Sequence, residues 1–156
     1  MTLTEFLEEK AKDEVARERW RLREEWVGSV NRLIGQFQTW LREADTPGVL
    51  VMWTEEIEIL EERLGAYRVP LLHVRLNATE VKAIPVARMN AGFLLFEGEG
   101  LGERKDGRID LLGVGMRYFL YRVLGGEERW YAIDEKSASK RLDRERFEAI
   151  MKAMLS

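Results

Sequence analysis

Cysteine is missing from this 156-residue chain, and histidine occurs once, as His73. The first absence excludes disulfides, thiol nucleophiles and cysteine-ligated zinc, and the second excludes a metal site made of several histidines. A Ser-His-Asp hydrolase would need His73 as its base, but no Gly-x-Ser-x-Gly turn is present to hold a nucleophile. His73 stands between Leu72 and Val74, so the sequence favours a histidine packed in a strand.

Long apolar runs and an excess of one charge are also missing. The chain has 25 Lys and Arg against 28 Asp and Glu, a formal net charge of −3 at pH 7. That balance is not typical of a protein that binds nucleic acid or membrane over its whole surface. Charges recur every few positions through residues 5–25, unlike a signal peptide, and no window reaches the ~18 apolar residues of a membrane span. We therefore expect a soluble, cytoplasmic protein that does not contact membranes.

What is present suffices for one hydrophobic core. Hydrophobic residues make up 46% of the chain and charged residues 34%, which is the balance of a folded rather than a disordered protein. We expect a single domain over residues 1–156. It divides into a helical segment over 1–44, an antiparallel sheet over 45–134, and a loop and C-terminal helix over 135–156.

The first zone has the apolar spacing of a helix, with Thr4 as the predicted N-cap. The intervals are mostly three and four residues; the apolar positions are Leu3, Leu7, Ala11, Val15, Leu22, Trp26, Val30, Leu33, Phe37 and Trp40. An unbroken helix would be about 60 Å long, at ~1.5 Å per residue. Either it breaks at Gly28-Ser29 into two packed helices, or its charged first half projects and pairs with another chain.

The second zone reads as strands separated by turns. Residues 49–64 predict a strand, with a helix over 53–64 as the alternative, and further strands are predicted over 67–76, 81–89, 92–96, 108–114, 116–123 and 129–134. Pro70 and Pro85 each remove a ladder donor, which predicts edge positions or bulges. Both faces of 116–123 are apolar, which predicts a strand covered on both sides.

A last apolar stripe follows Asp143, the predicted N-cap of a C-terminal helix. The fold class is therefore α+β. We expect a long N-terminal helix or helix pair, an antiparallel sheet of five to seven strands, and a C-terminal helix packed on one sheet face.

Two short acidic motifs carry the sharpest enzymatic signal: Asp110 in Gly-Arg-Ile-Asp-Leu, and Asp134 and Lys136 in Ala-Ile-Asp-Glu-Lys. An acid on one strand and Asp-x-Lys on a later one resemble the pattern of PD-(D/E)xK nucleases. That resemblance implies two acids that bind Mg²⁺ and a lysine that helps to activate water. If the chain turns near Gly113–Gly115 and Gly125-Gly126, the two acids lie two strands apart, about 10 Å, which is too far to share a metal. A nuclease is the less favoured alternative, and we expect no catalytic residue, metal or cofactor.

A glycine-rich segment, Gly98 to Gly102, has the superficial look of a phosphate loop. No Gly-Lys-Ser/Thr follows it, and the nearby glutamates would repel phosphate. The segment is therefore predicted to be a hairpin loop.

Nucleic-acid binding without catalysis is a second alternative. It would use a local basic patch, formed either by Arg68, Arg75, Lys82 and Arg88 or by Lys136, Lys140 and Arg141. The other interpretation is that these side chains form surface salt bridges, and that bases in 66–96 face acids in 45–65 across paired strands.

The favoured hypothesis is a non-catalytic interaction domain or accessory subunit. It would bind a protein partner, or a second copy of itself, through the N-terminal helix. Trp20 is the candidate contact, because it lies in a charged stretch and departs from the apolar stripe. Trp26, Trp40 and Trp130 are predicted to belong to the core.

Overall fold

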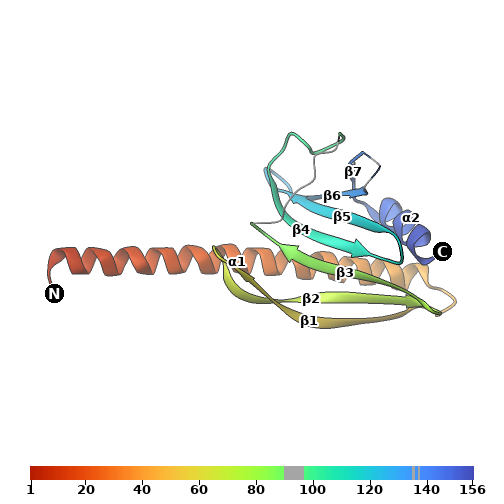
Figure 1. Ribbon diagram of the computed structural model, residues 1–156, viewed down its shortest axis with the longest axis horizontal. Helices are drawn as coiled ribbons and strands as arrows, with labels where there is room; N and C mark the ends of the chain where they lie inside the picture. The colour runs from red at the N-terminus through yellow and green to blue at the C-terminus, as the bar shows by residue number, and fades with distance from the viewer. Residues whose placement is uncertain (90–96, 135, 137) are drawn as a thin grey trace.

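The computed structural model describes residues 1–89, 97–134, 136 and 138–156. One helix, α1 (Leu3–Ala44), precedes a seven-stranded antiparallel sheet, and α2 (Arg144–Leu155) follows it (Figure 1). Neighbouring strands in the sheet are neighbours in the chain; they are β1 (Val51–Glu61), β2 (Gly65–Leu76), β3 (Thr79–Ala87), β4 (Lys105–Leu112), β5 (Arg117–Val123), β6 (Arg129–Asp134) and β7 (Lys140–Arg141). The α+β prediction is confirmed. Neither helix of the described chain is both long and apolar enough to cross a bilayer.

Helix α1 is continuous through Gly28-Ser29, so the predicted choice between one helix and two is settled in favour of one. It begins two residues earlier than expected: Thr2, not Thr4, is the N-cap, because Thr2 and Glu5 form a reciprocal capping box. Its C-terminal end is fixed by Asp45, whose carboxylate accepts the backbone N–H groups of Val49 and Leu50. These hydrogen bonds lower the pKa of Asp45.

The main core lies between the sheet and the two helices. Residues 26–41 of α1 include seven buried side chains, which form the inner face of the helix. Among them, Phe37 stacks on Phe147 of α2 with ring centroids 4.2 Å apart. Trp26 and Trp130 are buried as predicted, while Trp40 is partly buried against the same cluster. Figure 1 shows α2 beside the C-terminal end of α1, where Arg144 pairs with Glu43.

A second, smaller cluster lies on the opposite face of the sheet and contains Phe119, Tyr121, Val123, Tyr131 and Ile133. The prediction that β5 is covered on both faces is therefore confirmed. The glycine-rich loop closes over this cluster: the Tyr121 hydroxyl donates to the carbonyl of Glu99, and a side chain at Gly100 would meet the Tyr131 ring at 3.0 Å. Gly100 therefore permits this close packing.

The strand predictions over 49–64, 67–76, 81–89, 108–114, 116–123 and 129–134 correspond to β1–β6, whereas 92–96 lies outside the described residues. Pro85 lies at the register shift between β3 and β4, which is the predicted bulge. Pro70 of β2 pairs with Glu56 of β1. The described pairing of β2 with β3 covers only residues 72–76 of β2, so Pro70 lies outside it. The expected charge pairing occurs at one point in the β1–β2 register, where Arg68 faces Glu58. Sequence reasoning missed the two-residue strand β7.

Candidate interaction helix

The first half of α1 leaves the body of the protein. Every residue from 3 to 21 is exposed, and the first buried side chain of the helix is Trp26. These nineteen residues extend about 28 Å, at ~1.5 Å per residue. Figure 1 shows this red part of α1 running clear of the sheet. We call residues 3–21 the projecting segment.

The projecting segment exposes large apolar side chains. The exposed fraction is 72% for Leu3, 55% for Leu7, 61% for Val15 and 57% for Trp20. Single exposed apolar residues are ordinary, but these recur along one segment of α1 that has no buried residue. The prediction that Trp20 leaves the stripe agrees with helix geometry, because it lies about 140° around the axis from Val15 at ~100° per residue.

The stripe itself consists of Leu3, Leu7, Ala11, Val15 and Leu22, and we call it the helix stripe. Its members follow one another at intervals of four, four, four and seven residues. Near its end lies a hollow between α1 and the turn that joins β1 to β2, lined by Val15, Leu22, Glu62 and Arg63 among others. The apolar surface therefore continues from the projecting segment to the edge of the body.

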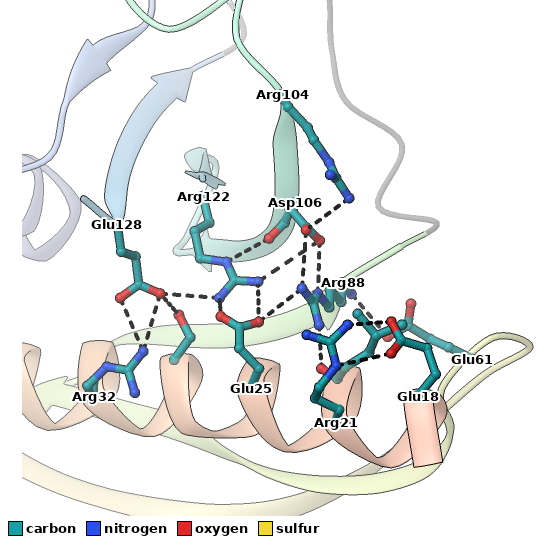
Figure 2. Close-up of polar contacts among 12 residues, drawn as sticks. Glu18, Arg21, Glu25, Arg32, Glu61, Arg88, Arg104, Asp106, Arg122 and Glu128 are labelled. Carbon is teal, nitrogen blue, oxygen red and sulfur yellow. Dashed lines mark hydrogen bonds and ion pairs between the residues drawn. The ribbon is translucent and has the colours of Figure 1, made fainter. Parts of the chain in front are cut away.

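A cluster of charged side chains fixes α1 where it leaves the body (Figure 2). We call it the ion network; it consists of Glu25, Arg88, Asp106, Arg122 and Glu128. Arg122 is fully buried and pairs with Glu25 at 2.5 Å and with Glu128 at 3.2 Å. Its guanidinium also lies 4.9 Å from the centre of the Trp26 ring.

Arg88 forms the other half of the ion network. It pairs with Asp106 and with Glu25, each at 3.0 Å, and it donates to the backbone carbonyl of Leu22. Arg23 donates to the carbonyl of Leu64 in the same region. Arg88 and Arg122 come from the sheet side, and together they bind Glu25 and the Leu22 carbonyl of α1. These buried contacts set the direction of the projecting segment.

Two further groups complete this anchor. Glu61, at the end of β1, accepts the backbone N–H groups of Arg88 and Met89 and the hydroxyl of Tyr67. Burial alone would raise the pKa of Glu128, but hydrogen bonds from Ser29 and Arg122 outweigh it, so the pKa lies below its ordinary value. The anchor thus joins α1 to strands β1–β5 and to the start of β6.

The residues proposed for nucleic-acid binding do not form one patch, although Arg75 and Lys82 lie on paired strands, both close to Glu80. Arg68 pairs with Glu58, and Arg75 lies over the Trp53 ring, both on β2 near one edge of the sheet. Lys140 and Arg141 lie on β7 at the opposite edge, and Lys82 is partly buried on β3. Arg88 requires a correction, because it is 5% exposed and belongs to the ion network rather than to a basic surface.

The acids of the nuclease-like motifs are also kept apart. Asp110 faces Phe119 across β4–β5, whereas Asp134 faces Tyr118 across β5–β6. Since neighbouring strand residues point to opposite faces, the two carboxylates lie on opposite faces of the sheet. Asp110 is held by Arg108 at 2.7 Å, and Asp134 accepts the backbone N–H of Lys136. Among the described residues, no group of three or more His, Cys, Asp or Glu could hold a metal ion.

His73 occupies the packed strand position that its neighbours predict. It lies on β2, 8% exposed, and its ring stacks on Trp53 with centroids 4.6 Å apart. Its Nδ1 lies 2.7 Å from a Glu80 carboxylate oxygen, and this hydrogen bond lowers the pKa of Glu80.

Sequence reasoning missed the ion network. Its signal was present at Arg122, a charge between Tyr121 and Val123 in a strand that is apolar on both faces. Pairing these charges required knowing that β3, β4 and β5 are adjacent and that α1 crosses them. Comparison of the chain with protein-family models, with curated proteins and with solved structures gives no match.

Proposed function

We propose that this protein is a non-catalytic interaction domain that binds a protein partner through the projecting segment. The observation that carries the proposal is the run of exposed apolar side chains on a helix held rigidly to the body. A pre-organised helix binds with little loss of conformational freedom, which favours its use as a docking element. The proposed location, the cytoplasm, rests on the sequence alone.

The stability of the body does not explain why the projecting segment is there. An isolated helix of this length is marginal in water, and its ion pairs Glu14–Arg17 and Glu18–Arg21 are exposed, so each contributes little. A partner packed on the apolar side chains would stabilise the helix as well as bury them.

Site-specific photocrosslinking tests the proposal. We would place p-benzoylphenylalanine at Leu7 or at Val15 of the full chain, and as a matched control at Val114, which is 83% exposed in the β4–β5 turn. The purified chain and the chain in an extract of its source cells are then irradiated. We expect adducts of higher mass from the helix positions and none from the control. The proposal fails if the helix positions give no adduct in either setting.

A further inference from the structure

We infer that the partner of the projecting segment is a second copy of this chain, bound antiparallel along the helix stripe. This inference rests on the proposed function and identifies its partner. Three features of the chain support it: the charge order along α1, the fit of the apolar side chains under a two-fold axis, and the place where the body begins.

Charge changes sign along the exposed part of α1. Residues 3–9 hold three acids and no base, whereas residues 17–23 hold four arginines and one acid. In a parallel pair, acids would face acids and arginines would face arginines. In an antiparallel pair, the acidic end of each copy lies against the arginine-rich end of the other, which favours this orientation.

Four of the five apolar side chains of the helix stripe match in the same orientation, and Leu7 lies opposite Glu18. A two-fold axis between Lys12 and Asp13 places Leu3 opposite Leu22, and within one residue of the same register it places Ala11 opposite Val15. The small side chain thus meets the larger one, as in a packed helix pair. Each copy repeats both contacts, because a two-fold interface is self-complementary.

Charged flanks of the helix stripe agree with this register. Glu8 and Arg19 are eleven residues apart, close to three turns, so they lie on the same flank. Lys10 and Glu14 lie on the other flank, one turn apart. The antiparallel register brings Glu8 of one copy near Arg19 of the other, and Lys10 near Glu14, within about two residues, which long side chains can span.

The position of the body fits the length of this overlap. Leu3 of the second copy would lie beside Leu22, at the hollow bordered by Glu62 and Arg63. A longer overlap would drive the second helix into the β1–β2 turn, and a shorter one would leave Leu3 and Leu7 in water. The overlap therefore ends where the projecting segment ends in both copies, with the two bodies at opposite ends.

Sedimentation velocity over a range of concentrations measures the dimer. We expect Val15→Glu to weaken it about 100-fold or more, because it places two unpaired carboxylates in the apolar contact. Glu8→Lys or Arg19→Glu alone should weaken it about threefold to tenfold, and the double variant should return to within about twofold of the parent. Trp20→Ala is the matched control on another face and should leave the dimer unchanged. Circular dichroism checks that each variant stays folded.

Cysteine crosslinking determines the orientation, since the parent has no cysteine. Leu3→Cys and Leu22→Cys chains should each resist self-crosslinking, because the two copies of each position lie about 28 Å apart, nineteen residues at ~1.5 Å. A mixture of the two should form a disulfide between unlike chains. Crosslinking of either variant to itself would show a parallel pair and overturn the inference.

A monomer at every concentration would also overturn it. In that case, photoadducts formed in the cell extract but not with the purified chain would leave the proposed function standing with a different partner. Loss of the dimer in Trp20→Ala but not in Val15→Glu would show that the copies meet on another face, which also contradicts the helix stripe.

Discussion

Replacing Arg122 by methionine removes the central cation of the ion network while keeping an apolar stem of similar length. In the parent, two buried guanidiniums, Arg88 and Arg122, balance the carboxylates of Glu25 and Asp106, and Glu128 is shared with the exposed Arg32. The variant therefore leaves one negative charge in excess beside Trp26. Loss of one partner from a buried ion pair costs roughly 3–5 kcal/mol.

The structure places this variant at the lower end of that range. Asp106 keeps Arg88 at 3.0 Å, and Glu25, whose side chain is 41% exposed, keeps Arg88 and can recover water. We expect the free energy of unfolding to fall by about 3 kcal/mol, or roughly 6–12 °C in the melting temperature for a chain of this size. Urea unfolding followed by tryptophan fluorescence and by circular dichroism measures it.

Arg32→Met is the matched control. Arg32 pairs with the same Glu128 at 3.4 Å, but its side chain is 64% exposed, so its loss should cost less than about 1 kcal/mol. Adding Glu25→Gln to Arg122→Met removes the excess charge and should recover about half of the loss. If Arg122→Met costs no more than Arg32→Met, the ion network does not hold α1 to the sheet and the reasoning is refuted.

Three further predictions concern the body of the protein. Gly107→Ala should destabilise it by at least about 2 kcal/mol more than Gly115→Ala. The carbon added at Gly107 would lie 2.2 Å from the Trp26 ring, whereas Gly115 faces open space. Equal melting temperatures of the two variants would contradict this. Burial and a hydrogen bond to a carboxylate raise the pKa of Tyr67, so the folded state keeps a proton that the unfolded state loses above pH ~10. Unfolding free energy should therefore fall from pH 10 to 11, and less steeply in Tyr67→Phe; an equal slope in both would count against it. Deletion of residues 2–17 should change the unfolding free energy of the monomer by less than about 1 kcal/mol, because these residues are exposed; a larger loss would show that they support the body.

Much of the fold could be predicted because it depends on local patterns. The three- and four-residue spacing from Leu3 to Trp40 reflects helical periodicity, and the alternation of glutamate and isoleucine over residues 56–59 reflects the two faces of a strand. The N-cap at Asp143 and the bulge at Pro85 follow from the chemistry of single residues and are confirmed. Such signals act between residues close in sequence, so they survive without knowledge of the tertiary structure.

Other features depend on which elements meet. The same helical spacing continues on both sides of Gly28, so periodicity could not tell whether α1 is one helix or two. In the structure α1 is one helix, and Ser29 is hydrogen-bonded to Glu128, ninety-nine residues later. From the sequence, Arg88 was a candidate for a basic surface, but in the structure it pairs with Asp106 and Glu25. Strand register likewise put Asp110 and Asp134 on opposite faces.

The sequence by itself determined the order of elements, the apolar faces and the charge order along α1. Tertiary structure decided which charges are buried together, and where α1 leaves the body and becomes available to a partner. The physical reason is that burial and ion pairing depend on distance in space, which the chain fixes only after its long-range contacts form.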